Sequence, residues 1–425
     1  MRNFFVKIIA LNFYFFLLTS CSNNPSFNVE RDYLDMQDAI LEAFINVKDS
    51  SVIQIPDGHY LFSKSLILDG KKNVTIRGNG MEKTVLSFKG QTQGAEGLRI
   101  ANCENITIEN MTVEDSNGDN IKVTDTDGII FKQIRSVWTG EVSTENGAYA
   151  IYPVLCNNVL IEESEAIGAS DAGIYVGQSD NVIIRNNKAY YNVAGIESEN
   201  STNVEIYGNE AYENTGGLLI FNLPGLTKVG SDVNVFKNHI FNNNLKNFGV
   251  KGSIVSTVPS GSGLIILATK NVEINNNIIE NHKTANTSIV SYELFASNKR
   301  RSGNDAKELP GGVRRILSRY KEDDSYDPFS GKVYIHDNIF NNNMFPDLRS
   351  EYGKLWALKN SFSIPDIVFD GIYPNNYLEM NEKIKSNYKI CINENQTIDF
   401  AVMDASNDFK NFSNDISNYN CEINE

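Results

Sequence analysis

A short phrase of alternating polar and apolar residues recurs along most of the chain. Most copies read Asn, then Val or Ile, then a variable residue, then Ile or Val, as in residues 105–108 (NITI) and 181–184 (NVII). Asp232 and Lys332 replace the Asn in two copies, and residues 128–131 (GIIF) are a degenerate copy. The first apolar position of the copies falls at residues 74, 106, 129, 159, 182, 204, 233, 272 and 333, and the closest copies lie 22 or 23 residues apart. Alternation with a period of two predicts short β-strands, and repetition at this interval predicts a solenoid.

The repeat therefore predicts an all-β fold, a parallel β-helix with three short strands in each coil. Leucine-rich repeats share the interval, but their Leu and Asn phrase is missing from the sequence. The recurring phrase forms the second strand of a coil in this interpretation. An Asn stands five residues after the first apolar position in six of the nine copies, and we interpret these residues as a structural stack in a turn: Asn79, Asn187, Asn209, Asn238, Asn277 and Asn338.

The limits of the repeat define the expected domains. We assign residues 33–344 to the β-helix and predict that apolar residues at helical spacing in 33–47 form a helix that caps its open N-terminal end. Residues 345–425 show only weak patterns, and we expect a C-terminal cap or a small appended module.

Longer intervals between copies predict loops. The largest insertion, at about residues 293–330, carries Arg300 and Arg314 in an otherwise acidic chain, and we expect a lid or a solvated loop there. Shorter insertions are expected at residues 138–146, 223–226 and 246–262.

The first 21 residues resemble the signal peptide of a bacterial lipoprotein. Arg2 and Lys7 accompany an apolar stretch, and residues 18–21 (LTSC) resemble a lipobox, in which the cysteine is acylated. We expect Cys21 to anchor the chain in the cell envelope, in the outer membrane of a Gram-negative bacterium, with residues 22–32 as a tether. An ordinary signal peptide or a short membrane anchor is the alternative.

The balance of charge limits the partners that the protein can have. Lys and Arg number 38 against 53 Asp and Glu, which gives a net charge of −15. No basic surplus is available to neutralise phosphates, so we expect no nucleic-acid partner.

Five cysteines invite different interpretations. In an oxidising compartment, Cys391 and Cys421 are candidates for a disulfide. Cys103 and Cys156 occupy one turn column two coils apart, which is about 9.6 Å at the spacing of adjacent strands. A disulfide needs Cα atoms within about 7 Å, so we expect both to be reduced thiols.

Several segments resemble a bacterial family of exported parallel β-helix repeat proteins. The resemblance covers about residues 33–295 and is carried by residues 146–153 (NGAYAIYP), 170–179 (SDAGIYVGQS), 192–201 (NVAGIESENS), 214–224 (NTGGLLIFNLP) and 258–263 (VPSGSG). It implies the pectin-lyase-like right-handed β-helix but supplies no established reaction. The Asp-Pro-His of mannuronan epimerases and the Arg-x-x-Pro-x-x-Arg of pectate lyases are missing.

The first strand of each coil offers the best candidate site. Counting back from the repeat places apolar residues inward: Leu98, Ile121, Ile151, Ile174, Ile196 and Leu218. The residues that follow them should then point outward. They form a ladder on one face, with a flatter second row two residues further on: Arg99, Lys122, Tyr152, Tyr175, Glu197 and Leu219, then Ala101, Thr124, Val154, Gly177, Glu199 and Phe221.

This face could carry chemistry on a polysaccharide. β-Elimination from a uronate needs a base, an acid and a cation on the carboxylate, and we assign Lys122 or Tyr175 as the base and Arg99 as the neutralising cation. Asp171, Glu197 and Glu199 are candidate oxygen ligands for Ca²⁺. Tyr152, Glu197, Glu199, Asp171 and Phe221 are the candidate substrate-binding residues. A plain solvated face with cross-strand pairing is the alternative.

The sequence therefore predicts a cell-envelope parallel β-helix lipoprotein that binds a polysaccharide. If it is an enzyme, we expect it to cleave or epimerise that polysaccharide, with a uronate-type substrate favoured. The alternative is a non-catalytic structural or interaction scaffold at the outer membrane. The sequence does not decide between them.

Overall fold

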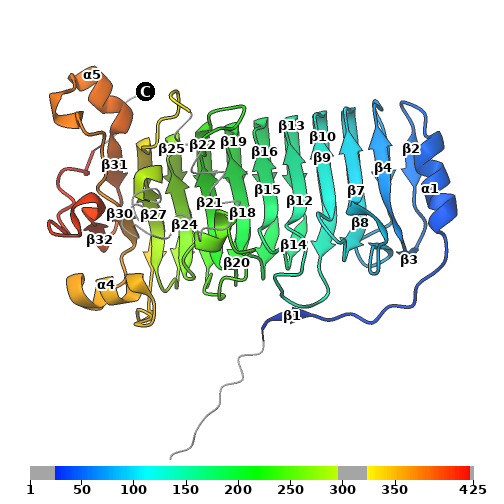
Figure 1. Ribbon diagram of the computed structural model, residues 1–425, viewed down its shortest axis with the longest axis horizontal. Helices are drawn as coiled ribbons and strands as arrows, with labels where there is room; N and C mark the ends of the chain where they lie inside the picture. Colours follow the sequence, from blue (N-terminus) through cyan, green and yellow to red (C-terminus); the bar gives the residue numbers. More distant parts are fainter. Residues whose placement is uncertain (1–23, 295–322, 422–425) are drawn as a thin grey trace, which may run out of the picture.

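The computed structural model describes residues 24–294 and 323–421, and these fold into a right-handed parallel β-helix. Figure 1 shows successive coils stacked as rungs between α1 (Gln37–Asn46) at one end and α4 (Glu351–Lys359) and α5 (Glu382–Lys385) at the other. Short 3₁₀ turns occur at Val255–Thr257, Tyr377–Glu379, Ser386–Tyr388 and Ala405–Asn407. The predicted fold is confirmed.

Three parallel ladders of strands form the walls. The first sheet contains β4 (Lys64–Asp69), β7 (Gln93–Ala101), β9 (Ile121–Thr124), β12 (Tyr149–Val154), β15 (Ala172–Gly177), β18 (Ala194–Glu199), β21 (Gly216–Phe221), β24 (Ser262–Leu267), β27 (Ala285–Val290), β30 (Ile367–Phe369) and β32 (Phe400–Val402). The second contains β2 (Val52–Gln54), β5 (Thr75–Arg77), β8 (Glu104–Glu114), β10 (Asp127–Val137), β13 (Asn157–Glu162), β16 (Asp180–Arg185), β19 (Thr202–Tyr207), β22 (Ser231–Phe236), β25 (Lys270–Asn275), β28 (Gly331–His336) and β31 (Ile390–Asn393).

The third ladder is shorter in each coil. It contains β3 (Gly58–Leu61), β6 (Thr84–Ser87), β14 (Glu165–Ile167), β17 (Lys188–Tyr190), β20 (Glu210–Tyr212), β23 (His239–Phe241), β26 (Ile278–Glu280) and β29 (Ile339–Asn341). The long strands β8 and β10 continue from the second ladder into the third, because β8 pairs with both β5 and β6, and β10 with both β13 and β14.

The recurring apolar residues fill the interior of the rod. Val159, Val182 and Val204 are in register on neighbouring strands and are at most 2% exposed. Strand alternation sends every second side chain inward, so each coil adds a few aliphatic side chains to one continuous core. The hydrophobic pattern of the sequence thereby sets the register of the whole stack.

Buried asparagines form a ladder along one turn, as the repeat predicted. The Asn209 side chain accepts hydrogen bonds from Asn187, and Asn209 donates to Asn238. The same pattern continues through Asn277 to Asn338. Asn79, which we placed in this stack, is exposed and outside it.

A second ladder, which we did not predict, runs through Asn192, Asn214 and Asn243. Each of the first two donates to the next side-chain oxygen, and the Asn243 amide contacts His282 Nε2 at 3.1 Å. Buried amides satisfy the turn's backbone groups in the interior.

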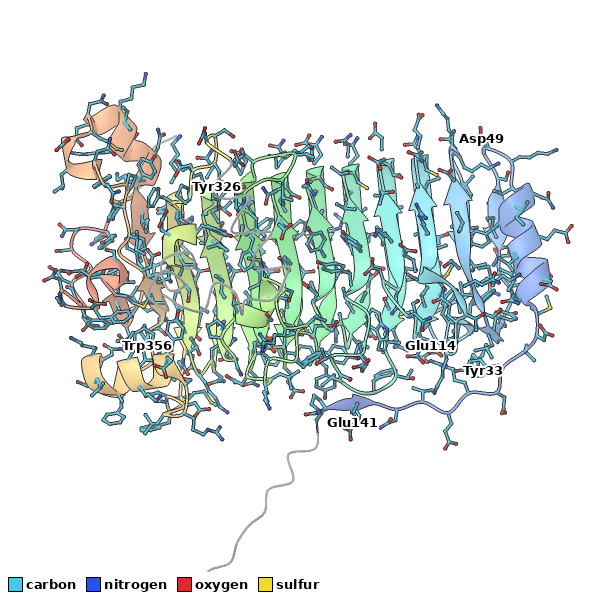
Figure 2. All side chains as sticks on the ribbon, in the orientation of Figure 1. Tyr33, Asp49, Glu114, Glu141, Tyr326 and Trp356 are labelled. Carbon is cyan, nitrogen blue, oxygen red and sulfur yellow. A yellow bond between two sulfur atoms is a disulfide. The ribbon has the colours of Figure 1, made fainter. Side chains whose placement is uncertain are left out.

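Both ends of the solenoid are covered. At the N-terminal end, α1 buries Ile40 and Phe44 against the first coil, which confirms the predicted capping helix. We placed the end of the repeat at residue 344, but β31 pairs with β28, and β30 with β27, in parallel register. The C-terminal region therefore continues the stack, while α4 contributes the buried Trp356, whose Nε1 donates to Thr284 O at 2.7 Å (Figure 2).

The N-terminal segment that we expected to be a tether lies against the rod from residue 24 onward. Strand β1 (Ser26–Phe27) pairs antiparallel with β11 (Gly140–Glu141). Arg31 Nε donates to the buried carboxylate of Glu114 at 3.0 Å, and Tyr33 Oη donates to the same group at 3.2 Å. Figure 2 shows Tyr33 and Glu114 close together on the edge along which this segment runs.

A disulfide joins Cys391 on β31 to Cys421, the pair that the sequence singled out. Cys103 and Cys156 are buried free thiols, also as predicted. Cys21 and most of the basic insertion, including Arg300 and Arg314, lie outside the described residues. Among residues 24–294 and 323–421, no helix is long and apolar enough to cross a membrane.

Candidate functional site

The outward ladder of the first sheet has the register that the sequence predicted. Arg99 pairs with Lys122, and Lys122 with Tyr152. Glu197 pairs with both Tyr175 and Leu219 on the neighbouring strands. The predicted inward residues Ile121, Ile151, Ile174 and Ile196 are fully buried. The coil alignment is therefore correct.

We expected outward residues of this ladder such as Tyr175 and Glu197 to be exposed, and this expectation is wrong at the C-terminal half of the ladder. Tyr175 is 4% exposed and Glu197 is 1% exposed. Loop residues cover them, because Leu223, Val255 and Val258 pack over the outward side chains of β15 to β24. Spacing along a strand determines which side a residue faces, but loops from other coils decide whether water reaches it.

Three tyrosines form a compact aromatic cluster in the middle of the ladder. The ring centroids of Tyr149 and Tyr152 lie 4.3 Å apart, those of Tyr149 and Tyr175 4.7 Å, and those of Tyr152 and Tyr175 5.0 Å. Burial raises the pKa of each phenol above its ordinary value. At neutral pH the three hydroxyls therefore stay protonated and act as hydrogen-bond donors, so Tyr175 is not a ready base.

Three carboxyl groups lie beside the tyrosines. Burial raises the pKa of Asp171 to about 8, reinforced by Glu199 and Asp119. It raises the pKa of Glu199 to about 7, although the Tyr175 hydroxyl, which donates to Glu199 Oε1 at 2.7 Å, opposes the shift. Burial and the two neighbouring carboxyls hold the pKa of Glu197 well above its ordinary value.

Glu197 is distinctive within this group. Within the described part of the chain its Oε2 is buried and has no hydrogen-bond partner. A buried polar atom without a partner costs free energy, and such atoms in native proteins call for an explanation. A bound ligand that hydrogen-bonds this oxygen would supply one.

The basic end of the ladder is more open and its charges are partly compensated. Lys122 Nζ lies 3.6 Å from both Glu96 Oε1 and Asp119 Oδ2, and 5.1 Å from the centre of the Tyr152 ring. Burial raises the pKa of Asp119 to about 6 despite the attraction of Lys122. Arg99 is exposed. Lys122 is thus held as a paired cation, which does not favour the predicted role of a base.

The acidic end of the ladder opens into a pocket of about 240 Å³. Tyr149, Asp171, Glu197 and Glu199 line it from the first sheet, and loop residues line the other side: Leu223, Pro224, Leu226, Ser253, Ile254 and Val255. The pocket brings together Asp171, Glu197 and Glu199 of the predicted site. Phe221 is buried in the adjacent apolar cluster and does not line the pocket.

The predicted calcium site gains no support from this geometry. Among residues 24–294 and 323–421, no group of three or more His, Cys, Asp or Glu side chains is arranged to hold a metal ion. Raised carboxyl pKa values also mean that the ligands would have to lose protons before a cation could bind.

Some pocket residues were missed by reasoning from sequence. Tyr149 precedes the inward Ile151 by two positions, so strict alternation along β12 would have placed its side chain inward as well. It lines the pocket because the alternation breaks at Ala150, which is buried in the core beside Ile151. Leu226 and Ile254 come from insertions between coils, and no periodic signal places them over the carboxyls.

A larger open groove, of about 1340 Å³, runs along the second sheet. Half-exposed aliphatic side chains form its floor and exposed turn asparagines form its edge: Ile130, Leu160 and Ile183, then Asn105, Asn158, Asn181, Asn203 and Asn271. It is larger than the pocket on the first sheet, but the carboxylates in its lining are exposed or half-buried and do not form a buried cluster. The chemistry therefore points to the smaller pocket.

Comparisons with known proteins support the fold. Residues 134–300 match the family described as right handed beta helix region. No curated protein sequence matches the chain.

Among solved structures, the chain is similar to the A-module of the mannuronan C-5 epimerase AlgE4 from Azotobacter vinelandii, with a TM-score of 0.50 and 15% identity over 87% of this chain and 92% of the other. A DFA-IIIase from Arthrobacter chlorophenolicus A6 has a TM-score of 0.46 and 11% identity, with 81% and 91% covered. An alginate lyase from a Paenibacillus species has a TM-score of 0.44 and 11% identity, with 73% and 94% covered. At such identities the likeness concerns the fold alone.

Proposed function

We propose that this parallel β-helix binds and processes a carbohydrate chain at the pocket of the first sheet. The observation that carries the proposal is the pocket itself, where three carboxyls with raised pKa values adjoin three tyrosines and one carboxyl oxygen is buried without a partner among the described residues. The mannuronan epimerase with the same fold acts, by its name, on a polysaccharide. Coils repeat at about 4.8 Å, close to the length of a sugar unit.

Most enzymes that hydrolyse a glycosidic bond use two carboxyl groups, one protonated and one ionised. Glu197, whose pKa burial holds well above its ordinary value, would give its proton to the departing glycosidic oxygen as the carbon–oxygen bond breaks. Glu199, aligned by the Tyr175 hydroxyl, would take a proton from the water whose oxygen bonds to the anomeric carbon. The net change is hydrolysis, with no other reactant.

A second reaction, elimination or epimerisation at a uronate, is favoured by one observation. Arg99 is exposed on the same ladder and could pair with a uronate carboxylate. Against it, Lys122 is already paired with two carboxylates and the tyrosines hold their protons. Hydrolysis therefore fits the described residues better.

The test is a panel of neutral and anionic polysaccharides, read for binding and for products. Hydrolysis yields new reducing ends, elimination yields unsaturated sugars that absorb in the ultraviolet, and epimerisation changes the uronate composition. We expect binding, and new reducing ends with at least one polysaccharide.

Matched variants locate the activity. Glu197→Gln keeps the size of the side chain and should lower turnover at least about 100-fold, since general acid catalysis contributes factors of this order. Glu205→Gln, an exposed residue on the second sheet, is the control and should leave turnover unchanged. Equal activity in both variants, or no carbohydrate bound by the wild type, would contradict the proposal.

We also propose that Cys21 is acylated and holds the protein in the cell envelope. The lipobox-like residues 18–21 support this proposal. The docked segment from residue 24 would then keep the rod close to the membrane, because little chain remains between Cys21 and β1.

A further inference from the structure

The exposure of the outward ladder falls steadily along the rod. Ile67, which pairs with Arg99, is 51% exposed, and Arg99 is also exposed. The Lys122 side chain is 27% exposed, Tyr175 is 4% exposed and Glu197 is 1% exposed. The face is therefore open over the N-terminal coils and deepens toward the carboxyls.

Beyond the carboxyls the face is sealed. The next outward residue, Leu219, is fully buried, and Ile265 after it is 7% exposed. They belong to a second apolar core with Val255, Val258 and Tyr292, so no room remains for a chain to continue along the sheet.

Hydrogen bonds hold the loop that forms this wall. Asn200 Nδ2 donates to Leu223 O at 2.9 Å, and Gly225 N donates to the Asp323 carboxylate at 3.0 Å. Tyr326 Oη donates to Asn222 O at 2.6 Å. These hydrogen bonds tie the wall to Asn200 on one side and to the segment of Asp323 and Tyr326 on the other.

From this arrangement we infer that the pocket receives the end of a carbohydrate chain, while the rest of the chain lies over Tyr152, Lys122 and Arg99. This inference rests on the proposed function and specifies its substrate as a chain terminus. Each polymer then offers one binding position at the end that fits, and an enzyme with this site shortens chains from that end. Leu226 and Ile254 in the wall are specificity-determining residues.

The number of protein molecules bound per chain tests the inference. The probes are alginate, laminarin and mannan, each separated into short oligomers and long polymers, with binding measured by calorimetry. For a probe that binds, we expect one protein per chain at every length, and small products of uniform size from the first minutes of reaction. Several proteins per long chain, or early products of random length, would overturn the inference and leave the proposed function intact.

Variants of the wall test whether its side chains contact the end of the carbohydrate chain. Both Leu226 and Ile254 are half-buried, so replacing them by Ala should leave the fold in place. In Leu226→Ala/Ile254→Ala we expect weaker binding of the chain end but still one protein per chain, because Leu219 and Ile265 still seal the sheet. Unchanged affinity in this variant would overturn the inference. The control Leu358→Ala changes a residue that is 83% exposed on α4, and this variant should still bind as one protein per carbohydrate chain with unchanged affinity. If none of the three probes binds, both the inference and the proposed function fail.

Discussion

Replacing the three pocket carboxyls by amides should change how the stability of the protein depends on pH. The variant combines Asp171→Asn, Glu197→Gln and Glu199→Gln, which preserve the shapes of the side chains. In the wild type, burial raises the pKa of each carboxyl, so the folded chain keeps protons that the unfolded chain releases. The contribution of these three carboxyls to stability is then greatest at low pH and falls as the pH rises through the interval between their unfolded and folded pKa values.

The size of the effect follows from counting protons. Unfolded carboxyls ionise near their ordinary pKa values, 3.8 for Asp and 4.5 for Glu, whereas the folded values are about 7 for Glu199 and about 8 for Asp171. Each retained proton lowers the free energy of unfolding by about 1.4 kcal/mol per pH unit, so three protons give at most about 4 kcal/mol per pH unit between about pH 5 and about pH 7. The loss is complete for Glu199 and Asp171 above about pH 8.

Thermal unfolding of the wild type, the triple variant and the control Glu205→Gln between about pH 5 and about pH 9 measures the dependence. The triple variant should lose most of the decline in melting temperature with pH, and its advantage over the wild type should grow as the pH rises. Infrared spectra at neutral pH should show a protonated carboxylic acid band in the wild type that is missing from the variant. Parallel melting curves for all three proteins, with no such band in the wild type, would refute the reasoning.

Three further predictions concern the scaffold and its anchoring. Asn209→Ala removes the acceptor for Asn187 and the donor to Ile184 O, and it should lower the free energy of unfolding in denaturant by about 2–4 kcal/mol. The control Asn234→Ala, at a residue with one side-chain partner at the surface, should lower it by less than about 1 kcal/mol. Alkylation of the denatured, unreduced protein should label Cys103 and Cys156 but neither Cys391 nor Cys421. In the native protein Cys156 should react slowly, because burial raises its pKa to about 11. Mass spectra that link Cys103 to Cys156 would contradict the coil register. Cys21→Ala should abolish the lipid mass increase and release the protein from membranes, and a wild type recovered without lipid would show that residues 18–21 do not act as a lipobox.

Local periodicity was enough to predict the coils of this protein. Each coil pairs with its neighbours through the same alternation of inward and outward side chains, so a phrase such as residues 181–184 carries its own register. The same counting correctly predicted the neighbours of Lys122, Tyr175 and Glu197 on the first sheet. It also placed Cys103 and Cys156 too far apart to be bonded, and both are free.

Periodicity failed where chain segments from different coils meet. The C-terminal strand β31 carries the phrase at residues 389–392 (KICI), in register with 332–335 (KVYI), but we missed it because the two copies lie 390 − 333 = 57 residues apart. Residues 24–35 bind along the side of the rod through Arg31 and Glu114, which are 83 positions apart.

The character of the pocket was decided in the same way. From sequence, Glu197 is an outward residue on a strand, and only the tertiary structure places Leu223 and Ile254 above it. That cover removes water, and the loss of water is the main cause of the raised pKa of the Glu197 carboxyl. Local sequence determines the direction of a side chain, whereas its solvation depends on insertions whose positions over the sheet no repeat encodes.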